Sequence, residues 1–92
     1  MTNSKVLVKN DKVIVTEWSF NVGDSTGTHK HQYNYFVVPM IDGELKIIYK
    51  ENKETISKLT KGAAYYRDKG IEHNVFIINY YPYSFIEVEM VE

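Results

Sequence analysis

Short segments in which apolar and polar residues alternate run along almost the whole chain, and turn-forming residues separate them. Between Lys12 and Phe20, for example, Ile14, Thr16, Trp18 and Phe20 all fall on one face. A side-chain period of two is that of a β-strand. No stretch combines a 3.6-residue period with a helix cap. About eight or nine such strands, with turns roughly every 6–12 residues, predict an all-β antiparallel barrel or sandwich.

Two details of these strands lead to specific expectations. Asp42-Gly43 has the composition of a tight turn and predicts a hairpin between its flanking strands. In the last strand we expect the apolar set to face the core, namely Ile86, Val88 and Met90. The expected strands are Lys5–Val8, Lys12–Phe20, His29–Ile41, Glu44–Tyr49, Thr55–Leu59, Ala63–Arg67, Glu72–Asn79 and Ser84–Val91.

Length and composition indicate one ordinary globular domain spanning residues 1–92. Eleven basic and 12 acidic side chains give a net charge of −1 without a basic stripe, which argues against a nucleic-acid partner. No apolar run approaches the roughly 20 residues that cross a bilayer, and the first residues do not resemble a signal peptide. We therefore expect a cytoplasmic protein without a membrane partner. Because so short a chain gains stability by burying one face, we also expect a homodimer.

The chain has three histidines, and their spacing is its most informative functional feature. His29 and His31 lie two residues apart, so a strand directs both side chains to one face. His73 begins a later strand and can join them across a barrel. Three neutral imidazoles suit one divalent transition-metal ion (Fe, Zn, Ni, Mn or Cu) and leave coordination positions open. A His-x-His pair alone is weak evidence for metal, because surface strands also carry it by chance.

The glycines around the first two histidines strengthen the metal interpretation. The segment runs from Gly23 through five residues to His29-Lys30-His31, then through four residues to Phe36 and six more to Gly43. This pattern resembles the first motif of the cupin superfamily, in which a glutamate usually occupies the place that we assign to Phe36.

A second group of residues resembles the second cupin motif. It runs from Gly62 through five residues to Asp68-Lys69-Gly70, then through two residues to His73 and three more to Ile77. The family usually has proline where Asp68 stands and asparagine where Ile77 stands. We expect both departures to affect turn geometry or packing more than chemistry.

The resemblance implies the cupin fold, an antiparallel double-stranded β-helix or jelly-roll barrel, and a metal ion held by the three histidines. Because Phe36 replaces the usual glutamate, the implied site has three histidines and one ligand position left to solvent or substrate. An alternative is that Glu87 or Glu89 of the last strand supplies the missing carboxylate.

Tyr66 and Arg67 are the candidate catalytic residues beside this site. A tyrosine can act as a general base or hydrogen-bond donor near a metal, and of Tyr65 and Tyr66 only one can face the lumen; we expect Tyr66. The alternative is that these tyrosines pack the barrel or a dimer interface. Arg67 can hold a substrate carboxylate, or it is a solvated surface charge. An apolar pocket wall is expected from Trp18, Phe20, Phe36, Val38 and Met40.

Two classes of function remain open at this level. The first is a metal-dependent enzyme acting on a small organic molecule, such as a dioxygenase, isomerase or lyase. The second is a non-catalytic module that binds or senses a small molecule or a metal. The second is favoured by the short chain, which leaves little material for lids or substrate-specific loops.

Overall fold

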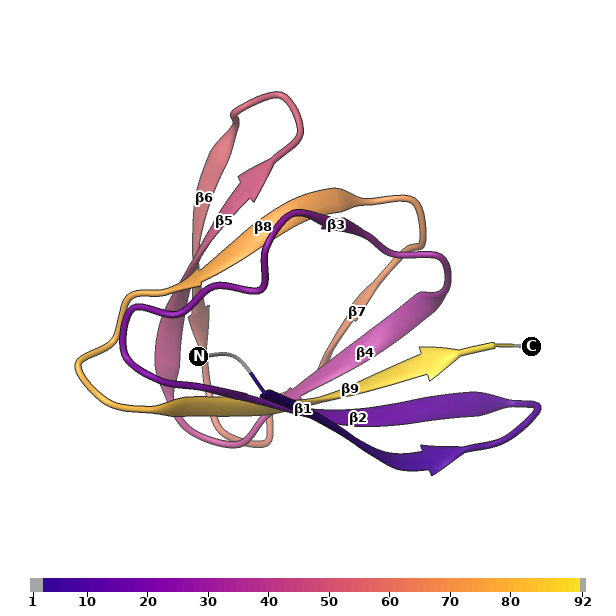
Figure 1. Ribbon diagram of the computed structural model, residues 1–92. Coiled ribbons are helices and arrows are strands. Elements are labelled where there is room, and N and C mark those ends of the chain that lie inside the picture. The colour runs from indigo at the N-terminus through magenta and orange to yellow at the C-terminus, as the bar shows by residue number, and fades with distance from the viewer. Residues whose placement is uncertain (1–2, 92) are drawn as a thin grey trace.

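The computed structural model describes residues 3–91, and all of the regular elements in this range are strands (Figure 1). No helix in the described range is long and apolar enough to cross a membrane. The strands are β1 (Asn3–Lys9), β2 (Val13–Phe20), β3 (His29–Lys30), β4 (Asn34–Pro39), β5 (Gly43–Tyr49), β6 (Glu54–Leu59), β7 (Tyr65–Arg67), β8 (Glu72–Ile77) and β9 (Tyr83–Met90).

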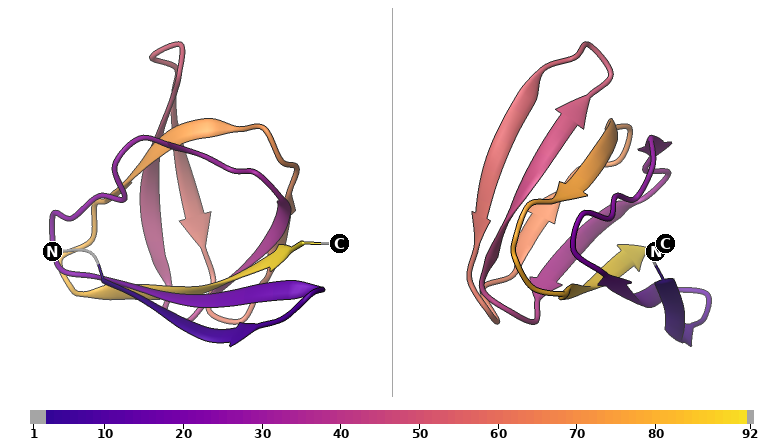
Figure 2. Two further views of the ribbon diagram at one scale, coloured as in Figure 1. Left: turned by 45° about the vertical axis from the view of Figure 1, so that its right-hand side comes forward. Right: turned by 60° about the vertical axis from the view of Figure 1, so that its left-hand side comes forward.

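The strands form two antiparallel sheets that face each other (Figures 1 and 2). One sheet has the order β1-β2-β9-β4-β7 and the other has the order β3-β8-β5-β6. The β5–β6 hairpin extends beyond the rest of the barrel. After β2 the chain passes back and forth between the two sheets, except at the β5–β6 hairpin within one sheet, as in a jelly roll. The predicted all-β antiparallel barrel is confirmed.

The core lies between the two sheets. Along β9 the inward side chains change from apolar to polar toward one end of the barrel. Along β9 the inward side chains are Tyr83, Phe85, Glu87 and Glu89, and their exposure increases in that order. The register pairs Tyr83 with Phe20 and Phe85 with Trp18 on β2, so these four rings share the interior face. The buried apolar residues are Phe20, Tyr35, Val37, Leu45, Ile47, Leu59, Val75, Ile77, Tyr83 and Phe85.

The inward face of β9 is the opposite of the predicted one. Ile86, Val88 and Met90 are only partly buried and lie on the outer face, whereas Glu87 is 8% exposed. Alternation identifies two sets of side chains but does not say which set faces the core. The prediction that the apolar set faces the core is wrong, because the polar end of the barrel buries the carboxyl group of Glu87 instead.

The expected long strand from His29 to Ile41 is divided into β3 and β4, which belong to different sheets. Within β4 the inward residues are Tyr35 and Val37, while Phe36 is 41% exposed. Phe36 and Met40 therefore do not line the barrel as predicted, and Val38 is only partly buried. The prediction for Trp18 is confirmed, because Trp18 lines the cavity described below. Phe20 is buried in the core instead and is not part of the cavity lining.

The turn at Asp42-Gly43 joins two sheets rather than two paired strands. β4 pairs with β7 and β9, whereas β5 pairs with β6 and β8, so the predicted hairpin is wrong. A close packing contact, rather than a hairpin turn, explains the glycine at position 43. A Cβ atom at this position would lie 2.7 Å from the Tyr83 ring and 2.7 Å from the amide nitrogen of Asn79. Close packing therefore requires a glycine here.

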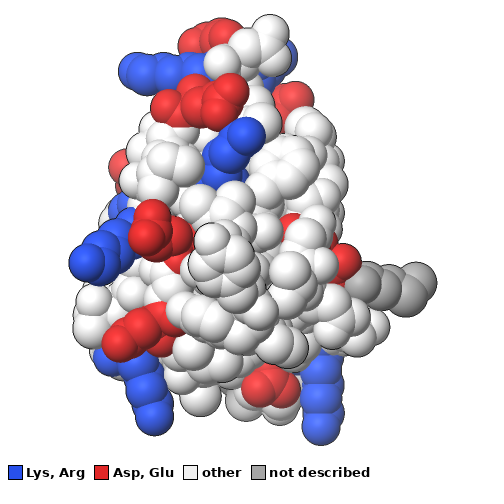
Figure 3. Space-filling view, turned by 90° about the vertical axis from the view of Figure 1, so that its left-hand side faces the viewer, with Lys and Arg blue, Asp and Glu red and all other residues white. Residues whose placement is uncertain are grey.

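Charged side chains of both signs are interspersed on the face of the molecule shown in Figure 3, around an uncharged centre. No stripe of one sign appears on that face. The surface there has the mixed charge of an ordinary globular protein.

Candidate metal centre

The pairing of β3 with β8 brings together histidines that are far apart in the sequence. His29 on β3 lies opposite His73 on β8 in the antiparallel register. His31 follows β3, and its N–H donates to the Ile71 carbonyl at 3.0 Å while its carbonyl accepts from the Gly70 N–H at 2.8 Å. Gly70 has a φ of 95°, which glycine adopts without steric cost. The turn before β8 thus fixes His31 beside His73.

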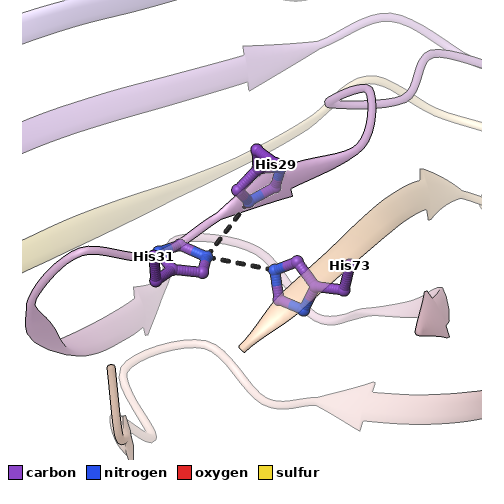
Figure 4. A group of neighbouring side chains, drawn as sticks. All are labelled: His29, His31 and His73. Carbon is purple, nitrogen blue, oxygen red and sulfur yellow. Dashed lines mark hydrogen bonds between the residues drawn. The ribbon is translucent and has the colours of Figure 1, made fainter. Parts of the chain in front are cut away.

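The three imidazole rings converge through their Nε2 atoms (Figure 4). Nε2 of His31 lies 3.0 Å from Nε2 of His29 and 3.0 Å from Nε2 of His73. His29 uses its other ring nitrogen, Nδ1, to donate to the Gly27 carbonyl at 2.9 Å. That hydrogen bond leaves Nε2 of His29 with a free lone pair directed at the other two rings.

Burial keeps two of these imidazoles neutral at physiological pH. His31 and His73 are each 7% exposed. Burial, followed by the charge of neighbouring His29, lowers the pKa of His31 to about 3 and the pKa of His73 to about 4. Neutral imidazole is the form that binds a metal, so both side chains are ready to act as ligands at neutral pH.

A cavity of about 330 Å³ opens beside the histidines. Its wall combines aliphatic and aromatic side chains with a polar end that contains the histidines, Arg67, Glu87 and Glu89. Such a combination is typical of small-molecule sites. The other lining residues are Trp18, Thr26, Lys30, Gln32, Tyr33, Tyr35, Val37, Leu45, Ile47, Tyr49, Tyr65, Ile71, Val75 and Phe85.

The structure brings Arg67 to the cavity but not Tyr66. Tyr66 is 44% exposed, and its ring lies against Phe36 on the outer face, with the ring centroids 5.6 Å apart. Tyr65 lines the cavity instead, because β7 pairs it with the inward residue Val37. The expectation that Tyr66 faces the lumen is therefore wrong. The Arg67 guanidinium lies 4.5 Å from the Tyr65 ring centroid and donates to the Tyr66 carbonyl at 2.9 Å.

Tyr35, rather than Phe36, is the β4 residue next to the histidines. Its ring stacks on His31 with centroids 3.9 Å apart and an angle of 18° between the planes. Tyr35 lies four residues after His31, whereas Phe36, to which we assign the place of the family's glutamate, is exposed on the outer face and does not reach the histidines. Burial is the main cause that raises the pKa of Tyr35 above its usual range, so its phenol stays protonated. Sequence reasoning missed this stacking contact.

Glu87 approaches His31 from β9, on the side away from the other histidines. Its Oε2 atom lies 4.0 Å from Nδ1 of His31. Burial, followed by the charge of Glu89, raises the pKa of Glu87 to about 7. The indole N–H of Trp18 lowers this pKa in part, although it makes no hydrogen bond of ordinary length. The structure thus places Glu87 at the outer nitrogen of His31 and not at the nitrogen that faces His29 and His73.

The metal-free protein is expected to show a pH-dependent stability difference between the wild type and Glu87→Gln. A carboxyl group with a raised pKa stabilises the fold below its ordinary pKa of 4.5, and this contribution is lost as the pH rises through about 7. The variant should therefore gain about 2–3 kcal/mol in unfolding free energy over the wild type between pH 5 and pH 8. Urea denaturation of chelator-treated proteins measures the difference, and a gap that does not change with pH would show that Glu87 ionises normally.

The donor set fits a transition-metal ion. Three imidazole nitrogens from three side chains point at a common position, and each residue offers one ligand atom within 4.8 Å of the others. A separation of 3.0 Å is what two nitrogens show when both bind one ion at about 2.1 Å and about 90° apart. Imidazole nitrogen suits Zn, Fe, Ni and Cu better than Mg or Ca. The histidine cluster is therefore compatible with one metal ion.

Comparisons with known proteins agree with this architecture. No family model matches the chain. It is 42% identical to the β-alanine degradation protein BauB of Pseudomonas aeruginosa over 85 residues, which cover 92% of this chain and 88% of that protein. The crystal structure of a cupin domain from Bordetella pertussis is 39% identical, with a TM-score of 0.93 over 97% of this chain and 92% of that one. A cupin-family protein from Methanocaldococcus jannaschii, 17% identical, shares the fold with a TM-score of 0.80 over 98% of this chain and 80% of that one.

Proposed function

The chain belongs to the cupin family, and on that premise we propose that it is a metal-dependent enzyme acting on a small organic molecule. The observation that carries the proposal is the convergence of the Nε2 atoms of His29, His31 and His73 at the polar end of a largely apolar cavity. The three histidines would hold one divalent transition-metal ion and leave part of its coordination shell open to a substrate.

The side chains around the histidines have distinct roles in this proposal. When bound, the metal ion supplies a Lewis acid or a redox centre. The stacked ring of Tyr35 keeps His31 in its orientation. Leu45, Ile47 and Val75 form an apolar wall that excludes water from the reacting molecule. Arg67 binds an anionic group of the substrate, because it is the guanidinium that lines the cavity.

The size of the cavity restricts the substrate to a small molecule. A volume of about 330 Å³ is at the lower end of the range for ligand sites. The name of the Pseudomonas aeruginosa relative refers to β-alanine degradation. Small carboxylates related to β-alanine are therefore the first compounds that we propose to test as substrates.

Product analysis tests the proposal. The protein, loaded separately with Fe, Zn, Ni, Mn or Cu, is incubated with a panel of small carboxylates while O2 consumption is followed. Conversion with O2 uptake would identify a dioxygenase, and conversion without it an isomerase or lyase. A ligand that binds tightly but returns unchanged with every metal would contradict the enzyme proposal and favour a non-catalytic binding module.

Replacing Arg67 is expected to weaken substrate binding more than turnover. A charge-assisted hydrogen bond contributes about 1.5–3 kcal/mol, so Arg67→Ala should raise KM for a carboxylate substrate roughly 10- to 100-fold. Arg67→Lys should recover part of the loss. The control is Lys69→Ala, two residues further on and outside the cavity lining. Steady-state kinetics that show equal KM values for Arg67→Ala and the control would rule out this role.

We also propose that the protein is a homodimer in which a second copy covers β1 and the outer face of the five-stranded sheet. All of β1 is exposed, including Val6, Leu7 and Val8, with Val6 57% exposed. The register continues this apolar surface onto Val15 of β2 and Val88 of β9. An edge strand with apolar side chains normally needs a partner.

Light scattering during size-exclusion chromatography tests the dimer. The wild type should have twice the 10.8 kDa mass of one chain, and a Val6→Lys/Val8→Lys variant should elute as a monomer. A wild-type mass of one chain at all concentrations would contradict the proposal.

A further inference from the structure

We propose that Glu87 is a positioning residue for His31: its carboxylate accepts the Nδ1–H of His31 through one bridging water and thereby keeps Nε2 directed at the metal position. The inference rests on the metal site proposed above. It assigns Glu87 a role in holding a ligand in place rather than a role as a ligand, and it concerns the side of His31 that faces away from His29 and His73.

The chemistry of imidazole makes an acceptor at this position necessary. A neutral imidazole carries one N–H, so a histidine that binds a metal through Nε2 must carry its proton on Nδ1. In His31 that N–H is buried, and a buried donor without an acceptor is costly. In His29, the Nδ1–H donates a hydrogen bond to the Gly27 carbonyl at 2.9 Å. Within residues 3–91, Glu87 is the partner that the structure places at Nδ1 of His31.

The backbone holds Glu87 rigidly in this place. Glu87 lies on β9, which is flanked on both sides by paired strands, and the register sets it beside Thr16 of β2 and Val37 of β4. The 4.0 Å gap between Oε2 and Nδ1 is longer than a direct hydrogen bond. One water molecule at about 2.8 Å from both atoms spans a gap of this size. Tyr35 covers one face of the His31 ring, so the ring is fixed by stacking and by the carboxylate together.

The distances argue against a second metal ion at this position. His31, Glu87 and Glu89 also offer ligand atoms within 4.8 Å of one another. An ion with bonds of about 2.1 Å to both Nδ1 of His31 and Oε2 of Glu87 would have to make an angle of about 145° across 4.0 Å. A hydrogen-bonded connection between these two atoms does not require such a wide angle. Carboxylate–histidine–metal arrangements are common, and removing the carboxylate typically lowers metal affinity 10- to 100-fold.

The test compares metal affinity among full-length variants that differ at one carboxylate. Cobalt(II) and zinc(II) dissociation constants are measured by chelator competition for the wild type, Glu87→Gln, Glu87→Leu and the control Glu17→Leu. We expect Glu87→Leu, which removes the acceptor, to bind 10- to 100-fold more weakly. Glu87→Gln keeps an acceptor oxygen and should fall between that variant and the wild type. The control should stay within about threefold of the wild type, because Glu17 lies opposite Ile86 on the outer face of the sheet and is not part of the cavity lining.

A second measurement uses the wild type alone and does not depend on the stability of any variant. Imidazole NMR of the zinc-loaded protein should show a slowly exchanging Nδ1–H on His31. Equal affinities for Glu87→Leu and the wild type, or rapid exchange of this proton in the zinc-loaded wild type, would overturn the inference. A wild type that binds neither ion would instead remove the proposed metal site itself, so the two failures are distinguishable.

Discussion

Purified His73→Ala protein is expected to contain less than about a tenth of the metal found in the wild type. His73 supplies one of the three nitrogens that converge beside the cavity, and its Nε2 lies 3.0 Å from that of His31. Losing a direct ligand should reduce affinity by more than the 10- to 100-fold typical of an outer-sphere partner. Elemental analysis after gel filtration in metal-free buffer measures the ratio of metal to protein.

The control for this experiment is Lys30→Ala. Lys30 lies between His29 and His31 on the same segment, but its side chain is exposed. It should keep the wild-type metal content. Equal metal content in His73→Ala and the wild type would mean that the metal is bound elsewhere. Circular dichroism of both variants confirms that the comparison is between folded proteins.

Tyr83→Ala should lower the free energy of unfolding by about 3–5 kcal/mol, which is the usual cost of removing a large buried aromatic ring. Tyr83 is 1% exposed and belongs to the buried core, opposite Phe20 in the register. A domain of this size has a total stability of only about 5–15 kcal/mol, so the loss is a large part of it. Denaturant unfolding of the metal-free protein gives the value.

Two further tyrosine substitutions test the cause of this loss. Tyr80, three residues earlier, is 98% exposed, so Tyr80→Ala should change stability by less than about 0.5 kcal/mol. Tyr83→Phe should be neutral or stabilising, because the Tyr83 hydroxyl is buried without a hydrogen-bond partner. Equal effects of Tyr83→Ala and Tyr80→Ala would show that the barrel is not closed around Tyr83.

The architecture could be predicted from sequence because a strand period and a turn composition are local signals. The same signals could not decide which face of a strand lies inside. On β9 the inward set contains Glu87 rather than Val88, and on β4 it contains Tyr35 rather than Phe36. Both outcomes follow from cross-strand register, which depends on contacts between residues far apart in the chain. The misassigned hairpin at Gly43 has the same origin, since sheet membership is not a local property.

The metal ligands could be proposed from sequence because the spacing of His29 and His31 and the motif around His73 are short-range patterns. The side chains that surround these ligands could not be predicted from the sequence. The stacking of Tyr35 on His31 and the approach of Glu87 to Nδ1 each join different strands. The choice between Tyr65 and Tyr66 likewise depended on how β7 pairs with β4. Side chains that position a ligand are thus harder to predict than the ligands themselves.

The central claim is that His29, His31 and His73 hold one metal ion, and anomalous X-ray diffraction at the metal absorption edge tests it most directly. Crystals of protein loaded in turn with Fe, Zn, Ni, Mn and Cu should give, with at least one of these metals, a single strong anomalous peak within about 2.3 Å of all three Nε2 atoms. Crystals that show no peak there with any of the five metals, or a peak held by other side chains, would contradict the account.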